Sequence, residues 1–126
     1  MDMRTPLGKV RGLGSAKDGT EHFWRQRLTA VANVPLLTFF VLFVATYAGA
    51  PYEELAAAIA NPIVAVVLSA VILSAVIHMR LGMQVIIEDY VHAEMAKLAL
   101  LMLNTFFAIA IGGLCLFAIL KIAFAG

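Results

Sequence analysis

The chain has 126 residues, of which 63% are hydrophobic and only 13% are charged, and its formal net charge is +1. Soluble domains are roughly half apolar and a quarter charged, so this composition excludes a soluble core and predicts an all-α integral membrane protein. The single cysteine, Cys115, excludes both a disulfide framework and a cysteine metal cluster within the chain.

Residues 1–21 are rich in glycine and charge and have no apolar period, which predicts an extended or loosely ordered tail. Six of the nine basic residues precede the first apolar run: Arg4, Lys9, Arg11, Lys17, Arg25 and Arg27. This bias predicts a cytoplasmic N-terminus and, after three spans, a C-terminus on the opposite side. Membrane orientation alone accounts for the basic residues of the tail, so they are not taken as a sign of nucleic-acid binding.

The first apolar run extends from Leu28 to Ala50 and is 23 residues long. A signal-peptide core has only ~7 to 15 residues, so the run is expected to remain in the protein as a membrane span. Asn33 and Pro35 lie in its cytoplasmic half, where the proline removes a backbone donor and can bend the helix.

Two further apolar runs complete a three-helix membrane domain at residues 22–126. The predicted spans are about 28–50, 62–87 and 98–120, each close to the ~20 residues that cross a bilayer. The first connector contains Glu53 and Glu54 but no base, as expected outside the cytoplasm, and part of it is predicted to form a short interfacial helix. Pro62 suits the first turn of the second helix.

His78 lies nine residues before the expected end of the second span at Ile87, or about 14 Å along a helix. At this depth an ionisable group costs on the order of a few kcal/mol unless it has a partner. Its i−4 and i+4 neighbours, Ser74 and Gly82, are small, and a neutral imidazole between small residues suits an axial haem ligand. A histidine that hydrogen-bonds a serine or a backbone carbonyl between helices is the other interpretation. His78 alone leaves both open.

No second histidine lies within a span, since His22 and His92 fall near the cytoplasmic edge. A bis-histidine haem would therefore need its second ligand from another polypeptide. Arg80 is two residues beyond His78 and points almost the opposite way. It either extends toward the cytoplasmic interface or pairs with a haem propionate or with an acidic group on a neighbour.

Asp89 and Tyr90 come just after the cytoplasmic end of the second span. A phenol can donate a hydrogen bond to a quinone carbonyl, and a nearby carboxylate can orient the phenol or relay protons. The alternative is an ordinary helix end among interfacial aromatic residues, and the two residues alone favour it.

The run from His78 to Tyr90, HMRLGMQVIIEDY, resembles the signature of the hydrophobic membrane anchor of succinate dehydrogenase. In that family a haem-ligating histidine is followed by a glycine four residues on and later by an Asp-Tyr pair, here Gly82, Asp89 and Tyr90. Gln84 also matches the family. A weaker resemblance is R-x-T-A at residues 27–30, and the chain length and three spans fit as well.

The resemblance implies a four-subunit succinate:quinone oxidoreductase, respiratory complex II, in a bacterial inner membrane. This chain and a companion cytochrome b subunit would form the two halves of a heterodimeric transmembrane helix bundle. Together they would anchor the flavoprotein and iron–sulfur subunits, share haem b and complete the quinone pocket. FAD, the iron–sulfur clusters and succinate oxidation belong to the partner subunits, so this chain is expected to be non-catalytic.

The resemblance also implies roles for single residues. His78 would be one axial ligand of the haem iron. Ser74, Gly82 and Arg80 are expected beside the haem because of their spacing to His78. Arg27 would lie near a haem propionate or the quinone entrance. The quinone site would use a hydrogen bond from Tyr90, supported by Asp89. Arg80 departs from the family pattern, which leaves its own role open.

Two other functions remain as alternatives. A small transporter or proton channel would line a water-filled path with His78 and Arg80. Three short spans with a mostly apolar, acid-free interior disfavour it unless the chain oligomerises. The other alternative is a purely structural anchor without cofactor contact. A reducible b-type haem spectrum, in a complex with flavin and iron–sulfur subunits, separates these functions from the one that the resemblance implies.

Overall fold

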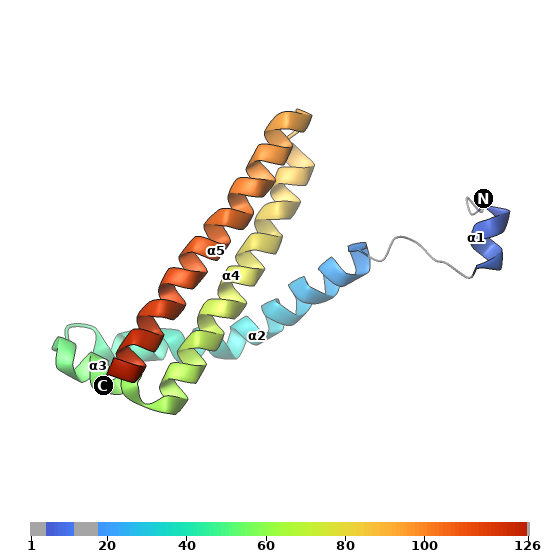
Figure 1. Cartoon of the computed structure of the whole chain (residues 1–126). Coiled ribbons are helices and arrows are strands. Elements are labelled where there is room, and N and C mark those ends of the chain that lie inside the picture. The colour runs from blue at the N-terminus through green and yellow to red at the C-terminus, as the bar shows by residue number, and fades with distance from the viewer. Residues whose placement is uncertain (1–4, 12–17, 126) are drawn as a thin grey trace.

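A computed structural model describes residues 5–11 and 18–125, and every regular element in these ranges is an α-helix (Figure 1). The helices are α1 (Pro6–Val10), α2 (Asp18–Tyr47), α3 (Tyr52–Ala60), α4 (Pro62–Tyr90) and α5 (Glu94–Ala125). Three helical segments are long and apolar enough to cross a membrane: Thr20–Tyr47, Pro62–Tyr90 and Glu94–Ala125. The predicted all-α, multi-pass membrane fold is confirmed.

The helices differ from the predicted spans mainly at their ends. Both α2 and α5 begin several residues before their apolar runs, because backbone hydrogen bonding continues through charged residues that remain at the aqueous boundary. The apolar run predicts an end of the first span at Ala50, but α2 ends at Tyr47. Gly49 follows with a φ of 80°, a left-handed conformation that terminates helices and that glycine adopts without strain.

The N-terminal tail is more helical than its composition predicts. Residues 6–10 form the single-turn helix α1, and α2 already starts at Asp18, so the boundary expected at residue 21 lies inside a helix. Residues 1–4 and 12–17 of the expected tail lie outside the described residues.

The predicted short helix in the first connector is present as α3, and a single residue joins it to α4. The backbone N–H of Asn61 donates to the Ala58 carbonyl at 3.2 Å and caps the end of α3. Its side-chain Oδ1 accepts from the backbone N–H groups of Ile63 at 2.9 Å and Val64 at 3.5 Å. Pro62 occupies the first turn of α4, as predicted.

Helix α4 contacts both of the other long helices. It runs side by side with α5, whereas α2 crosses it obliquely, and α3 lies against the ends of α4 and α5 (Figure 1). Gly112 is buried on α5, where an added Cβ would lie 3.4 Å from Cγ1 of Val76 on α4. Small residues at this contact let the two helices approach closely. Most large apolar side chains of α2 and α5 stay exposed, so lipid or other chains must cover them.

Candidate functional site

A row of polar side chains follows one face of the first half of α2. The row consists of His22, Gln26, Thr29 and Asn33. Successive members are three or four residues apart, which places them above one another on a helix. All four are partly buried, whereas Phe23 and Trp24 beside them are exposed. The row faces α4, as the contacts below establish.

The polar row of α2 packs against small residues of α4. Ser74 is buried, and its hydroxyl lies 2.8 Å from Oδ1 of Asn33, to which it donates, and 3.4 Å from the Thr29 carbonyl. An added Cβ on Gly82 would lie 3.5 Å from Nε2 of Gln26. Ser74 and Gly82, expected to leave room for a flat ligand, therefore contact α2 in this chain, and they allow the two helices to approach.

His78 lies between Ser74 and Gly82 and is partly buried. Its Nδ1 is 3.1 Å from Oγ1 of Thr29, so His78 does form an interhelical hydrogen bond, but its partner is a threonine hydroxyl and not the serine or backbone carbonyl considered from the sequence. Its Nε2 makes no hydrogen bond within the described ranges and is not one of their buried unpaired atoms. One ring nitrogen is thus held inside the chain, and the other is open to a ligand from outside.

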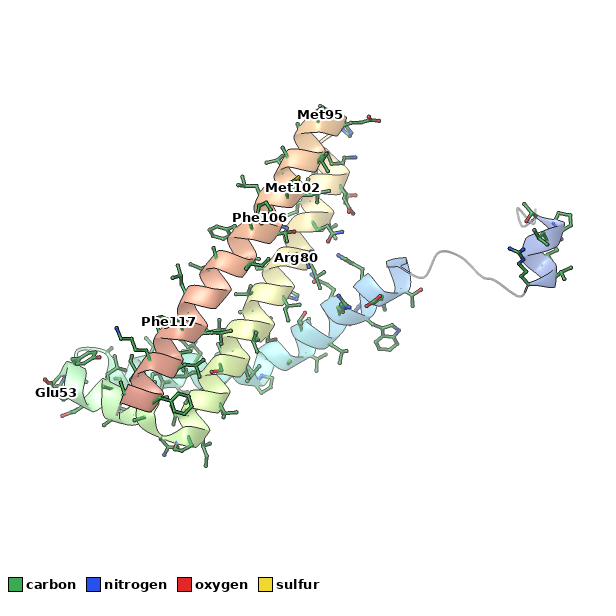
Figure 2. The ribbon with its side chains drawn as sticks, in the orientation of Figure 1. Glu53, Arg80, Met95, Met102, Phe106 and Phe117 are labelled. Carbon is green, nitrogen blue, oxygen red and sulfur yellow. The ribbon has the colours of Figure 1, made fainter. Side chains whose placement is uncertain are left out.

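Arg80 lies midway along α4 (Figure 2). Its Nε donates to Oγ1 of Thr105 at 3.4 Å, and its backbone carbonyl accepts from Nδ2 of Asn104 at 3.0 Å. Across residues 5–11 and 18–125 no carboxylate forms an ion pair with it. A cation at this depth of a membrane helix normally pairs with an anion or a strong acceptor, so Arg80 can receive one.

A polar cavity of about 180 Å³ lies beside Arg80, between α2 and α4. It is lined by Glu21, His22, Arg25, Arg80, Leu81 and Gln84. Glu21 is paired with Arg25, and Nε2 of His22 is buried without a hydrogen-bond partner, as is Oε1 of Gln26 nearby. Arg25 is thus already neutralised by a carboxylate of the same wall, whereas Arg80 has no ion pair in the described ranges and is the cation that the cavity offers to an anionic group.

Sequence reasoning missed the contributions of His22, Arg25 and Gln26 to this site. The signal was their helical spacing to Thr29, which puts polar groups on one face at the start of an apolar helix. Arg27, a residue that the sequence does point to, is exposed, and its guanidinium carbon lies 5.0 Å from the Phe23 ring centroid. Arg27 does not line the polar cavity.

Asp89 and Tyr90 are the last two residues of α4, about 18 Å along the helix from His78 in the case of Tyr90. Both are exposed, Tyr90 to 76%, and neither side chain has a hydrogen bond to the described part of the chain. The structure therefore does not join them to His78 in one pocket. It leaves a phenol and a carboxylate side by side at the helix end, accessible to another molecule.

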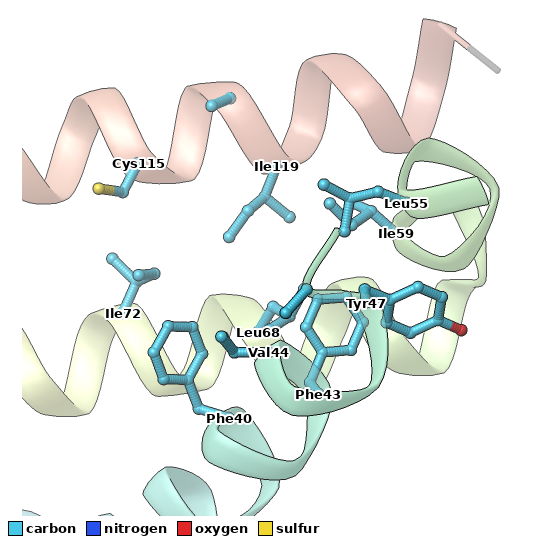
Figure 3. Close-up of a pocket in the computed structure, with 12 residues that line it drawn as sticks. Phe40, Phe43, Val44, Tyr47, Leu55, Ile59, Leu68, Ile72, Cys115 and Ile119 are labelled. Atoms are coloured by element: carbon cyan, nitrogen blue, oxygen red, sulfur yellow. The ribbon is translucent and has the colours of Figure 1, made fainter. Parts of the chain in front are cut away.

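The opposite end of the bundle contains an apolar cavity of about 410 Å³ (Figure 3). Among its lining residues are Phe40, Phe43, Leu68, Ile72, Cys115 and Ile119. The hydroxyl of Tyr47 points away from it (Figure 3). No site residue predicted from the sequence lines this cavity, and its surface suits only apolar groups.

Comparison with known proteins gives one consistent result. The family model of the succinate dehydrogenase/fumarate reductase transmembrane subunit matches residues 1–112. The chain is 32% identical over 97 residues to the succinate dehydrogenase hydrophobic membrane anchor subunit of Paracoccus denitrificans, which covers 77% of this chain and 75% of the relative. It is 34% identical over 100 residues to the succinate dehydrogenase membrane anchor subunit of Reclinomonas americana, covering 75% and 82%.

A further relative is the hydrophobic membrane anchor subunit of succinate dehydrogenase from Rickettsia bellii, 29% identical over 108 residues and covering 86% of each chain. No solved structure matches the chain at a significant level. The matched residues include the polar row of α2, all of α4 and the first part of α5. The chain therefore belongs to the family of succinate dehydrogenase/fumarate reductase transmembrane subunits.

Proposed function

We propose that this membrane anchor subunit of succinate dehydrogenase co-ligates haem b with a companion cytochrome b subunit and completes a quinone-binding site. The observation that carries the proposal is the state of His78. Its Nδ1 is held by Thr29 of α2, whereas its Nε2 is unpaired and not buried. An imidazole nitrogen in this state is suited to axial coordination of a metal.

The donor set also fits a haem. The described residues contain no group of three His, Cys, Asp or Glu side chains that could hold a bare metal ion. A macrocycle brings four nitrogen ligands of its own and needs only axial ligands from protein. In this proposal Nε2 of His78 would hold the haem together with a residue of the cytochrome b subunit, and the haem would supply one-electron redox chemistry.

Charge supports a place for the haem propionates. Arg80, on the wall of the polar cavity beside α4, has no ion pair in the described ranges, whereas Arg25 on the same wall is paired with Glu21. Carboxylates in such a site gain charge-assisted hydrogen bonds from guanidinium. Arg27 lies outside this cavity, and its proposed place stays near a haem propionate or the quinone entrance. Ser74 and Gly82 act indirectly, because their small size lets α2 bring Thr29 to His78.

The quinone site is assigned to the end of α4. Tyr90 is exposed and without a hydrogen-bond partner in the part of the chain described, so its phenol is free to donate to a quinone carbonyl. Asp89 is adjacent and also exposed, and we assign it to orienting the phenol or relaying a proton. The partner subunits would complete the pocket, since this chain leaves that end of the helix uncovered.

Partners and orientation follow from the same assignment. The basic N-terminal segment favours the cytoplasmic side for the start of α2 and therefore for Asp89 and Tyr90. The iron–sulfur and flavoprotein subunits would dock there, where electrons from succinate reach quinone, and the C-terminus would be periplasmic in a bacterial inner membrane. Oxidation of succinate is assigned to the flavoprotein, not to this chain.

The haem assignment is tested by His78→Leu in the complete complex. We expect the reducible b-type haem spectrum to be lost or the haem midpoint potential to shift, because Leu has no nitrogen to coordinate iron. Succinate oxidation with a soluble dye should persist. His92→Leu is the matched control, because His92 is exposed in the connector between α4 and α5. An unchanged spectrum and potential in His78→Leu would refute the assignment.

The quinone assignment is tested by Tyr90→Phe. Loss of one hydrogen bond worth about 1.5 kcal/mol should lower kcat/KM for quinone about tenfold, while haem content and assembly remain normal. Steady-state quinone reduction by the purified complex measures this. Tyr52→Phe on α3 is the control, since Tyr52 is similarly exposed but lies at the other end of α4. Native quinone kinetics in Tyr90→Phe would remove Tyr90 from the site.

A further inference from the structure

We infer that Thr29 is a positioning residue for His78. Its hydroxyl oxygen accepts a hydrogen bond from the Nδ1–H of His78 and thereby fixes the tautomer in which Nε2 carries a free lone pair. This inference rests on the proposed role of His78 as a haem ligand and adds the residue that prepares it.

The number of protons on the Thr29 hydroxyl decides which residue is the donor in its hydrogen bond with His78. Oγ1 of Thr29 lies 2.9 Å from the Arg25 carbonyl, 3.1 Å from the Gln26 carbonyl and 3.1 Å from Nδ1 of His78. A hydroxyl has one proton and two lone pairs, and carbonyl oxygens can only accept. If the threonine proton goes to a carbonyl, the proton in the contact with His78 must come from Nδ1.

Other threonines in the spans show where the proton of such a hydroxyl goes. Thr38 donates to the Val34 carbonyl at 2.7 Å, Thr46 to Leu42 at 2.8 Å and Thr105 to Leu101 at 3.1 Å. Each is a bond to the carbonyl four residues earlier, as is that from Thr29 to Arg25. This local bond forms within one helix and does not depend on the partner helix. The hydroxyl of Thr29 is thus left with acceptor capacity toward α4.

A second contact holds the two helices in the required register. One turn from His78, the Ser74 hydroxyl donates to Oδ1 of Asn33 at 2.8 Å. Asn33 is one turn from Thr29 on the same face of α2, so the two interhelical bonds lie next to each other along the crossing. This arrangement limits sliding of α2 against α4 and keeps Oγ1 of Thr29 within reach of His78.

The expected chemical effect is on the basicity of Nε2. A hydrogen bond from the second ring nitrogen of a ligating histidine orients the ring and raises its basicity as a ligand, and removing such a partner typically weakens metal binding 10- to 100-fold. Ferric haem gains more from a basic ligand than ferrous haem does. A tenfold loss confined to the ferric form raises the midpoint potential of a one-electron couple by about 59 mV.

The experiment uses Thr29→Val in the complete complex, because valine has nearly the same shape but no acceptor. We expect a rise in haem midpoint potential of that order and a changed low-spin haem signal in electron paramagnetic resonance. Thr29→Ser, which restores the acceptor, should behave like the native complex. Thr38→Val is the matched control, since it removes a hydroxyl bonded only to its own helix.

A native potential and a native resonance signal in Thr29→Val would overturn the inference. If Thr29→Val does not assemble, Thr29→Cys provides the test, because a thiol is a weak acceptor of similar size. Thr29→Cys should raise the potential relative to Thr29→Ser, and equal potentials would overturn the inference. The result that would refute the proposed function is a different one: a native haem spectrum and potential in His78→Leu.

Discussion

Helix α4 is hydrogen-bonded to both of its long neighbours, but the two sets of bonds hold different groups. Toward α2 the contacts are directional hydrogen bonds, from Ser74 to Asn33 and between His78 and Thr29. Toward α5 the hydrogen bonds involve Arg80, which bonds with Thr105 and Asn104, and one turn away Val76 packs on the buried Gly112. A hydrogen bond fixes the orientation of a side chain, whereas packing of small residues fixes the distance between helices.

This difference explains why the candidate ligand lies where it does. The proposed ligation requires that His78 present Nε2 in one direction, and its hydrogen bond with Thr29 of α2 is the contact that orients its ring. The contact with α5 has no such directional demand at Gly112, so it can serve the stability of the helix pair. We therefore expect substitutions at the α5 contact to affect stability most, and substitutions at the α2 contact to affect the properties of a bound cofactor.

The largest effect on stability is expected from Gly112→Leu. An added Cβ would already be in van der Waals contact with Val76, at 3.4 Å from its Cγ1, so the further carbons of a leucine side chain would push against the packed face of α4. Overpacking of this kind costs about 1–3 kcal/mol. Thermal denaturation of the detergent-solubilised complex should show a clear decrease in midpoint.

Gly113→Leu is the control for that prediction, because no atom lies within 4 Å of an added Cβ at this neighbouring position. Its denaturation midpoint should stay close to that of the native complex. Equal losses in the two variants would mean that the close approach of α4 and α5 at Gly112 does not determine stability.

A smaller effect is expected from Ser74→Ala. It removes the donor to Asn33, and hydrogen bonds between membrane helices contribute about 0.6 kcal/mol on average. The denaturation midpoint should fall slightly, and less than in Gly112→Leu. Ser69→Ala is the control, because the Ser69 hydroxyl donates only to the Ala65 carbonyl of its own helix. A loss in Ser74→Ala that exceeds the loss in Gly112→Leu would reverse the comparison of the two contacts.

The spans could be predicted from sequence because each is a long apolar run, and the cost of burying unpaired backbone groups in lipid requires such a run to be helical. The helix ends could not. Asp18 and Glu94 begin helices that hydropathy alone starts later, and Gly49 ends α2 earlier. Hydropathy measures transfer to lipid, whereas helix ends depend on local backbone conformation and capping.

The candidate site, too, has features that could be predicted from the sequence and features that could not. His78 could be found from sequence because an ionisable residue inside an apolar run is costly. Its contact with Thr29 could not, since the two residues are 49 positions apart and meet only through the crossing of α2 and α4. The polar row of α2 was visible as a helical spacing, but spacing does not tell which neighbouring helix the row faces. For the same reason, the contacts of Ser74 and Gly82 with α2 were not anticipated.

The junction at Asn61 affects the conformational entropy of the connector. One residue both ends α3 and begins α4, with φ of −63° and ψ of 124°, so no free loop residue separates the two helices. Fixing the backbone of each additional loop residue would cost about 1–2 kcal/mol. The change of direction between α3 and α4 therefore requires the ordering of a single residue.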